Sequence, residues 1–285
     1  MEISSRTRVC ALIGDPVEHS LSPIMQNKAF NHLGLDFVYV VFEVKKTDLE
    51  KAIEGVRSLK IHGLNVTKPL KVDVVPYLDV LDENALEVGA VNTVLNRDGR
   101  LIGYNTDGKG ALEALRRSGV DVKDVKVVIL GAGGASRAIS HALVGEAREI
   151  VILNRTVEKA AELAERIRRK YRGKVRYGPL IYRELKKELK DAELLVNATS
   201  VGMAPYSHVS PVERELLRPD LCVFDLVYNP VETKLLLEAK AIGAKIVDGL
   251  SLLVHQGALA FEIWTGKTAP IDVMREAVRR KIEGE

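Results

Sequence analysis

The segment from residue 65 to residue 71 places polar side chains and a lysine at the end of an apolar run. It reads Asn65-Val66-Thr67-Lys68-Pro69-Leu70-Lys71. Because side chains alternate along a strand, Asn65 and Thr67 share one face. Pro69 suits the first turn of a helix, so we expect Lys71 just inside a helix, close to that pair. A lysine there can give a proton to a carbonyl oxygen and stabilise the developing negative charge, as a ketone reduction requires.

A second polar segment, Asn105-Thr106-Asp107-Gly108, ends another apolar run and opens a helical pattern. A carboxylate near a lysine orients the ammonium and accepts a hydrogen bond from a substrate hydroxyl. Each residue also has a structural alternative. Lys71 can be a solvated helix residue, Asp107 a helix cap, and the polar pair ordinary hydrogen-bonding groups at a strand end.

A glycine-rich loop follows the apolar run 127–130 and opens a helix. Its residues are Gly131, Ala132, Gly133, Gly134, Ala135 and Ser136. The first glycine permits a tight turn, the second lets the backbone approach a pyrophosphate, and the helix amino terminus supplies amide donors. Ser136 stands where a third glycine is usual. The alternative is an ordinary glycine-rich turn, but the strand before the loop and the helix after it favour dinucleotide binding.

The residues after the next predicted strand distinguish between the two nicotinamide cofactors. An NAD enzyme usually has a carboxylate there for the ribose hydroxyl, whereas this chain has Asn154, Arg155 and Thr156. Arg155 can bind a 2′-phosphate in a bidentate manner, and Lys159, one helical turn on, adds a second charge. The sequence therefore favours NADP.

The elements that must position these residues alternate between apolar runs and amphipathic segments. In the first third they predict strands and helices at 9–13, 22–33, 37–44, 47–59 and 61–66. Runs at 91–95 and 101–104 flank a turn-rich stretch and predict a hairpin. We expect helices at about 108–117, 157–170, 250–264 and 271–282, and strands at 127–130, 150–153, 194–198, 221–226 and 245–247.

This pattern predicts an α/β protein of two domains. Residues 1–106 and 250–285 are expected to form a substrate-binding and catalytic domain, with the last helices packing back on it. Residues 107–249 are expected to form an NADP-binding Rossmann-like domain.

Composition excludes several classes of protein. The 42 basic and 39 acidic side chains are dispersed along 285 residues, which is not the pattern of a nucleic-acid-binding surface. Neither a secretion signal nor a membrane-spanning run is evident, so we expect a cytoplasmic protein. Cys10 and Cys222 lie in apolar runs and are expected to be buried. The histidines lack metal-ligand spacing, so no metal is predicted.

The chain resembles the shikimate dehydrogenase family over nearly its whole length. Seven segments match in order: 14–23, 65–71, 89–93, 105–108, the glycine loop, 154–156 and 197–203. The resemblance implies reversible, NADP-dependent reduction of 3-dehydroshikimate to shikimate in the biosynthesis of aromatic amino acids. It further implies a small-molecule partner and no nucleic-acid or membrane partner, and we expect a monomer or a homodimer.

The resemblance also implies roles for individual residues. Lys71 would be the acid/base residue, paired with Asp107. Substrate would be bound by Ser20 and Ser22 at its carboxylate, by Asn65, Thr67, Asn92 and Asp107 at its hydroxyls, and by Tyr228 and Gln256. The cofactor would contact the glycine loop, residues 154–156, Lys159, Thr199, Leu226 and Gly249.

A few positions depart from the family pattern or leave alternatives. Ser251-Leu252 stands where Gly-Met is common, and this roughly preserves volume beside the nicotinamide. Lys68 occupies an often apolar position and is the main rival to Lys71. His19 and His255 lie next to expected substrate residues, where we expect support or packing. Glu83 matches a position near the cofactor but equally suits a solvated helix face.

Two other functions are compatible with the fold. One is a quinate/shikimate dehydrogenase using NAD, whose relatives tend to carry an acidic residue after the second strand of the nucleotide-binding domain. The other is a non-catalytic sensor, for which we would expect loss of the Lys71 and Asp107 pair or an added DNA-binding arm. This chain shows none of these features.

Overall fold

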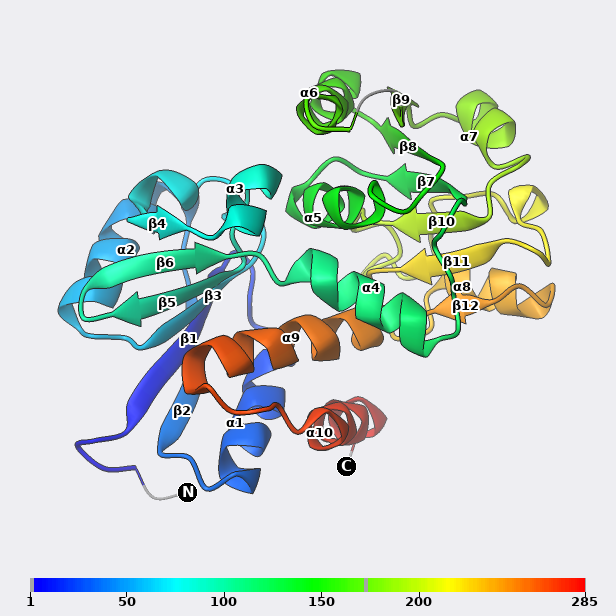
Figure 1. Ribbon diagram of the computed structural model, residues 1–285. Helices are drawn as coiled ribbons and strands as arrows, with labels where there is room; N and C mark the ends of the chain where they lie inside the picture. Colours follow the sequence, from blue (N-terminus) through cyan, green and yellow to red (C-terminus); the bar gives the residue numbers. More distant parts are fainter. Residues whose placement is uncertain (1–2, 172–173, 285) are drawn as a thin grey trace. The chain divides into compact units, whose positions relative to one another are not determined.

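Two β-sheets organise the computed structural model, which describes residues 3–171 and 174–284 (Figure 1). The first unit consists of residues 1–110 and 254–285, and the second of residues 111–253. The chain therefore returns to the first unit from residue 254 onward. The assignment of substrate binding to one unit and NADP binding to the other stays a prediction at this point.

The first sheet has the strand order β2-β1-β3-β5-β6-β4. Its first three strands are parallel, because a helix connects each to the next. β5 and β6 form the predicted antiparallel hairpin. The strands are β1 (Arg8–Gly14), β2 (Phe37–Glu43), β3 (Gly63–Val66), β4 (Val80–Leu81), β5 (Thr93–Arg97) and β6 (Arg100–Tyr104).

Helices cover both faces of this sheet. On one face, α2 (Leu49–Ser58) buries Leu49, Ile53 and Val56 against apolar residues of β1, β3, β5 and β6. On the other face, α1 (Ser22–His32) and α9 (Gly249–Thr265) contribute Phe30 and Phe261, whose rings stack 5.2 Å apart. α10 (Ile271–Glu283) packs beside α1, as Figure 1 shows.

The strand directions bring four loops to one edge of the first sheet. β1 and β3 end at this edge because they are parallel. β5 is antiparallel to β3 and therefore starts there, and β6 returns to the same edge. The residues that follow β1, β3 and β6, and those that precede β5, are consequently neighbours in space.

The helix predicted to begin at Pro69 is not formed. Residues 68–74 form consecutive turns, followed by the 3₁₀ helix η2 (Val75–Tyr77), so the prediction that Lys71 lies inside a helix is wrong. Pro69 and Pro76 each lack an N–H donor, and Pro76 disfavours a helical conformation at the residue before it. The short helix α3 (Glu83–Val88) follows β4 and begins with Glu83, which is exposed.

The second sheet is wholly parallel, with the order β12-β11-β10-β7-β8-β9. α4 (Asp107–Arg117), α5 (Gly134–Leu143) and α6 (Val157–Arg168) contribute to one apolar layer. α7 (Tyr182–Glu188) and α8 (Lys234–Ala241) contribute to the layer on the opposite face. The strands are β7 (Lys126–Leu130), β8 (Glu149–Asn154), β9 (Val175–Pro179), β10 (Leu194–Asn197), β11 (Cys222–Asp225) and β12 (Ile246–Val247).

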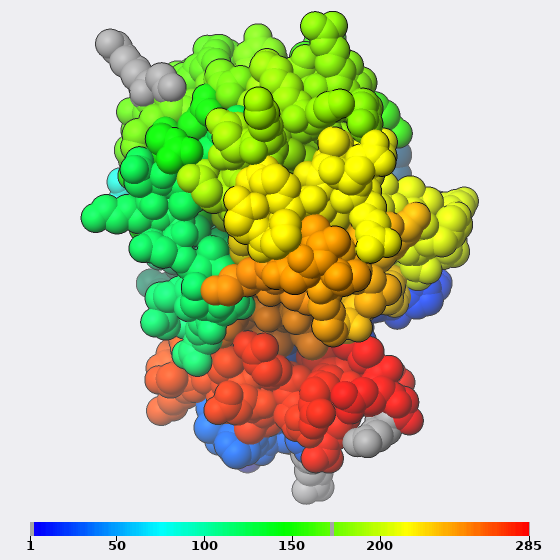
Figure 2. Space-filling view, turned by 90° about the vertical axis from the view of Figure 1, so that its right-hand side faces the viewer, coloured from blue at the N-terminus to red at the C-terminus, as the bar shows by residue number. Residues whose placement is uncertain are grey.

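Helices on both faces of a parallel sheet define the predicted Rossmann-like unit. β9 and α7 were not predicted, because Gly178 and Pro179 weaken the strand pattern. α8 was also missed. The chain around α8 is yellow to orange on the face shown in Figure 2. Leu237 of α8 is exposed.

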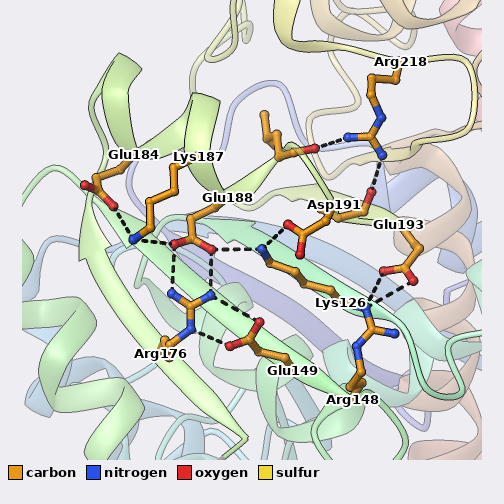
Figure 3. Close-up of polar contacts among 12 residues, drawn as sticks. Lys126, Arg148, Glu149, Arg176, Glu184, Lys187, Glu188, Asp191, Glu193 and Arg218 are labelled. Atoms are coloured by element: carbon orange, nitrogen blue, oxygen red, sulfur yellow. Dashed lines mark hydrogen bonds and ion pairs between the residues drawn. The ribbon is translucent and has the colours of Figure 1, made fainter.

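An ion-pair network joins residues at the amino-terminal edge of the second sheet (Figure 3). Glu188, whose side chain is only 3% exposed, pairs with Lys126, Arg176 and Lys187. These contacts hold the pKa of Glu188 at about 2, chiefly through the hydrogen bond from Arg176. The glycine loop follows the carboxyl end of β7, so the network lies at the opposite edge of the sheet.

Candidate active site

Lys71 and Asp107 form a close ion pair in the first unit. The Nζ atom of Lys71 donates to Oδ2 of Asp107 at 2.5 Å. The Asp107 side chain is 5% exposed and that of Lys71 is 17% exposed, so solvent reaches the ammonium more readily. A hydrogen bond from Val91 N to the Lys71 carbonyl, 2.8 Å long, holds the backbone of Lys71 in place. The rival Lys68 is exposed, and desolvation lowers its pKa.

Asn92 holds the other side of the Asp107 carboxylate. Its Nδ2 donates to Asp107 Oδ1 at 2.8 Å and lies 3.3 Å from Gln256 Oε1. Its Oδ1 accepts from the backbone N–H of Thr106 at 2.8 Å. Four residues predicted from the sequence, Lys71, Asn92, Asp107 and Gln256, are therefore brought together.

Asn65 lies at the end of β3 and connects to the same cluster. Its Nδ2 donates to the carbonyl of Asn92 at 3.0 Å and to Oγ1 of Thr93 at 3.1 Å. Its Oδ1 accepts from the hydroxyl of Tyr39 at 2.8 Å. The sequence pattern did not indicate Tyr39 or Thr93 as site residues. Thr93 lies in the family-matching segment 89–93, but no role was assigned to it.

The loops after β1 and β3 carry the remaining predicted substrate residues of this unit. Ser22, the first residue of α1, is buried, and its N–H donates to Ser20 Oγ at 3.3 Å. Thr67 N donates to the Ile13 carbonyl at 2.9 Å and Asp15 N donates to that of Lys68 at 3.1 Å, which ties the two loops together. Within the described residues, no hydrogen bond joins Ser20, Ser22 or Thr67 to the cluster of Lys71, Asn92, Asp107 and Gln256.

The glycine loop of the second unit has the geometry of a phosphate-binding turn. Gly131 adopts φ 104°, and a Cβ there would lie 2.9 Å from the Ala198 carbonyl oxygen. Gly133 caps α5, and no atom lies within 4 Å of where its Cβ would be. Ser136 is buried and donates to the Gly131 carbonyl at 2.7 Å, which explains how the loop accepts serine. The helix amino terminus thus presents amide donors beside open space, which fits a pyrophosphate.

The residues expected to bind the 2′-phosphate follow β8. Arg155, Thr156 and Lys159 are exposed. Asn154 Nδ2 donates to the Thr156 carbonyl at 2.8 Å and so stabilises the turn between β8 and α6. Two exposed cations on a braced turn suit a dianionic phosphate.

A buried polar network positions the loops after β10 and β11. Asp225 is fully buried and accepts from Thr233 Oγ1 at 2.6 Å, Asn197 Nδ2 at 2.9 Å and the Val227 N–H at 3.0 Å. Burial raises its pKa to about 6. Thr199 donates to Asn197 Oδ1 at 2.7 Å. The network therefore braces two of the predicted cofactor contacts, Thr199 and the segment after Asp225.

Gly249 lies beside this network. A Cβ at Gly249 would be 2.5 Å from the carbonyl oxygen of Leu226, so only glycine fits. Leu226 and Tyr228 are both half-buried, and burial raises the pKa of Tyr228. The predicted residues Thr199 and Leu226 thus lie in loops of the second unit, and Gly249, the first residue of α9, lies against the loop that contains Leu226.

The histidines do not form a metal site. Among the described residues no group of three or more His, Cys, Asp or Glu side chains is arranged to hold a metal ion. His255 is buried on α9 with Nε2 at 3.3 Å from Arg275, and His19 is exposed. Both Cys10 and Cys222 are buried as free thiols, and burial raises the pKa of each.

The fold and these loops define a two-unit α/β protein with a Rossmann-like nucleotide-binding sheet. Three family models match the chain: the shikimate dehydrogenase substrate-binding domain at 12–94, the shikimate/quinate 5-dehydrogenase model at 113–234 and the shikimate 5'-dehydrogenase C-terminal domain at 249–279. The chain belongs to the shikimate dehydrogenase family.

Individual relatives agree with this assignment. The shikimate dehydrogenase (NADP⁺) of Methanopyrus kandleri is 52% identical over 98% of this chain and 97% of its own. A shikimate dehydrogenase crystal structure in complex with NADP⁺ has a TM-score of 0.93 and 46% identity, covering 99% of this chain and 98% of that one. The Thermus thermophilus enzyme, in complex with NADP(H) and shikimate, has a TM-score of 0.86 and 41% identity, covering 96% and 99%.

Proposed function

We propose that this chain is an NADP-dependent shikimate dehydrogenase, which interconverts 3-dehydroshikimate and shikimate in aromatic amino-acid biosynthesis. The observation that carries the proposal is the Lys71–Asp107 ion pair, 2.5 Å long and braced by Asn92, in a chain 52% identical to a shikimate dehydrogenase (NADP⁺). An intact ion pair also disfavours the non-catalytic sensor, for which we would expect its loss.

Lys71 is the proton donor in this proposal. Reduction of the ketone adds a hydride to the carbonyl carbon, and the oxygen takes the proton from Nζ of Lys71 as the C=O double bond becomes a C–O single bond. In the oxidative direction Nζ takes the hydroxyl proton. The ammonium also stabilises negative charge on the oxygen, and Asp107 fixes where the ammonium lies.

Substrate is positioned by side chains of the first unit in this proposal. Ser20 and Ser22 donate hydroxyl hydrogen bonds to the carboxylate, and the hydrogen bond from Ser22 N to Ser20 Oγ keeps the two residues together at the entry to α1. The ring hydroxyls are bound by Asn65, Thr67, Asn92, Asp107 and Gln256. Tyr228 of the second unit is the remaining proposed substrate contact. Several neutral donors and acceptors are what a ring with three hydroxyl groups requires.

The second unit holds the cofactor in this proposal. When bound, NADPH would supply the hydride for reduction and NADP⁺ would accept it in the oxidative direction. The pyrophosphate is bound by amide groups of residues 131–135, and the 2′-phosphate by Asn154, Arg155, Thr156 and Lys159. Leu226 would lie by the nicotinamide, and Thr199 and Gly249 would lie near the cofactor. The open space at Gly133 and the exposed cations after β8 support this assignment.

The test is an absorbance assay at the nicotinamide band with purified protein. NADP reduction with shikimate, and much slower reduction with NAD or with quinate, is the expected result. A preference for NAD or quinate would assign the protein to the broader quinate/shikimate branch. Binding of shikimate without turnover would reject the dehydrogenase assignment in favour of a sensor.

Location and assembly are also part of the proposal. Within the described residues no helix has the length and apolarity needed to cross a membrane. We propose a cytoplasmic enzyme that acts as a monomer or a homodimer. Light scattering coupled to size-exclusion chromatography measures the assembly, and a larger oligomer would contradict this part of the proposal.

A further inference from the structure

A chain of buried hydrogen bonds leads from β2 to the Asp107 carboxylate, and every donor in it points the same way. The Tyr39 hydroxyl donates to Asn65 Oδ1 at 2.8 Å, and Asn65 Nδ2 donates to Thr93 Oγ1 at 3.1 Å. The Thr93 hydroxyl donates to Asn92 Oδ1 at 3.1 Å, and Asn92 Nδ2 donates to Asp107 Oδ1 at 2.8 Å.

The direction of this chain is fixed at its Asp107 end. An ionised carboxylate only accepts, so the atom of Asn92 that faces Asp107 must be Nδ2. The opposite atom of that amide faces the backbone N–H of Thr106 at 2.8 Å, which only donates and therefore requires Oδ1. The partners of Oδ1 and Nδ2 therefore require the same orientation of the Asn92 amide. In a flipped amide, Oδ1 would face the Asp107 carboxylate and Nδ2 would face the Thr106 N–H.

Thr93 transmits this orientation to Asn65. Its hydroxyl carries one proton, which is used on Asn92 Oδ1, so toward Asn65 it can only accept. The facing atom of Asn65 must then be Nδ2, which also satisfies the Asn92 carbonyl at 3.0 Å. Thr93 is 0% exposed, so it takes part without reaching solvent or a ligand.

We propose that Thr93 is a positioning residue that fixes the amide orientation of Asn65 and thereby makes Asn65 a hydrogen-bond acceptor toward the substrate. Both Nδ2 protons of Asn65 are used inside the protein, and one lone pair of Oδ1 is taken by Tyr39. The second lone pair of Asn65 Oδ1 is therefore available to accept a hydrogen bond from the substrate. This inference rests on the proposed function, because it takes the ligand to be a polyhydroxylated ring.

The consequence is a rule for the ligand. The ring substituent that meets Asn65 must be a hydroxyl that donates, and a ketone oxygen at that position would face an acceptor. The Lys71 ammonium, a donor, is the group suited to the ketone oxygen. Asn65 and Lys71 therefore distinguish a hydroxyl from a ketone on the same ring, which orients the ring in the site.

Two substitutions at Thr93 separate this role from packing. Thr93→Val keeps the shape and removes the hydroxyl, whereas Thr93→Ser keeps the hydroxyl. Loss of one buried hydrogen bond to a binding group is worth on the order of a 10-fold change in equilibrium. We expect Thr93→Val to raise KM for shikimate by about that factor, with kcat changed less than ~3-fold and KM for NADP unchanged. Thr93→Ser should restore KM to near the wild-type value.

Val94→Ala is the matched control for loss of stability. Val94 follows Thr93 in β5, is buried, and packs in the apolar layer on the opposite face of the sheet. It should lower the melting temperature without raising KM for shikimate. An unchanged KM in Thr93→Val, or an equal rise in Thr93→Ser, would overturn the inference. Absence of shikimate turnover in the wild-type protein would instead reject the proposed function itself.

A measurement on the wild-type protein covers the case in which Thr93→Val does not fold. The side-chain amide protons of Asn65 and Asn92, observed by NMR, should exchange slowly with deuterium before and after shikimate is added. Slow exchange in both states supports the inference, since these donors are already bonded inside the protein. Fast exchange without ligand, together with a new hydrogen bond from Asn65 Nδ2 to bound shikimate, would contradict it.

Discussion

Lys71 Nζ and Asp107 Oδ2 lie 2.5 Å apart, yet the two residues come from very different backbone segments. Lys71 belongs to the turns after β3, whereas Asp107 is the first residue of α4. The carboxylate is fixed by Asn92, and the lysine backbone is fixed through its carbonyl by Val91. A flexible side chain thus gains one defined position beside a buried acceptor, which is what a proton donor at a reacting oxygen needs.

Replacement of Lys71 by alanine should lower kcat more than a thousand-fold in the proposed reaction. The proton and the positive charge act mainly in the transition state, so KM for shikimate should change by less than ~5-fold. Steady-state kinetics with shikimate and NADP measures both. Lys68→Ala is the control, with an expected loss of kcat below ~5-fold. A larger loss for Lys68→Ala than for Lys71→Ala would exchange the two assignments.

Substitution of Arg155 by aspartate should reverse the cofactor preference. The change removes a bidentate phosphate partner and places a carboxylate where NAD enzymes bind the ribose hydroxyl. KM for NADP should rise by about 100-fold while KM for NAD stays equal or falls. Lys159→Ala, which removes only the second cation, should raise KM for NADP by ~10-fold at most. An unchanged NADP preference in Arg155→Asp would reject Arg155 as the 2′-phosphate ligand.

Glu188→Gln should destabilise the protein at neutral pH by about 1–3 kcal/mol, because it leaves Lys126 and Arg176 without a buried anionic partner. The native pKa of Glu188, about 2, lies below its ordinary value of 4.5. Its stabilising contribution is therefore complete above pH 4.5 and declines as the pH falls toward 2.

Melting temperatures of Glu188→Gln and the wild-type protein between pH 7 and pH 3 measure this effect, and the difference should shrink with acidification. Glu184→Gln is the control, since Glu184 pairs with Lys187, whose side chain is 62% exposed. Glu184→Gln should lower the free energy of unfolding by less than ~0.5 kcal/mol. A pH-independent difference for Glu188→Gln would contradict the predicted role of its charge.

Asp225→Asn should show the opposite dependence on pH. The native pKa of Asp225, about 6, lies above its ordinary value of 3.8 because the carboxyl group is buried. Its charged form is therefore less favourable in the folded state, and the contribution of Asp225 to stability falls as the pH rises from 4 through 6. A shift of this size corresponds to ~3 kcal/mol at most.

The comparison for Asp225→Asn is again the melting temperature, measured between pH 4 and pH 7. The melting temperature of the variant should rise relative to that of the wild-type protein as the pH rises. Asp220→Asn, at an exposed carboxylate paired with Arg218, is the control and should show no such gain. A constant difference for Asp225→Asn across this range would mean that Asp225 does not titrate there.

Much of the site followed from the sequence because its residues stand at the ends of strongly apolar strands. Lys71 and Asp107 were predicted as a pair, and they are in contact. The helix expected at Pro69 was wrong, since local preference at one proline did not account for a second at Pro76. The supporting hydroxyls of Tyr39 and Thr93 could not be predicted, because hydrogen-bond direction depends on partners brought together only by the sheet.

The edge elements show the same limit in the fold. β9 lies at the margin of the second sheet and has a neighbour on one side only, so its sequence tolerates Gly178 and Pro179. The central strands β7 and β10 are buried on both sides and were read directly from their apolar runs. Whether a strand lies at the edge or in the centre of a sheet depends on its pairing with distant strands, which the local sequence does not reveal.

The contacts of the Trp264 indole mean that the first unit can be completed only at the end of synthesis. Its Nε1 donates to the Val94 carbonyl at 3.0 Å, and the ring fills the space over Gly63, where a Cβ would lie 2.5 Å from that nitrogen. The ribosome makes residues 111–253, a contiguous unit, before it makes this tryptophan. The apolar residues Phe30 and Phe37 of the first unit therefore remain without their C-terminal partners when the second unit has already been synthesised. A nascent chain can therefore complete the unit with the parallel sheet before the unit that contains Lys71 and Asp107.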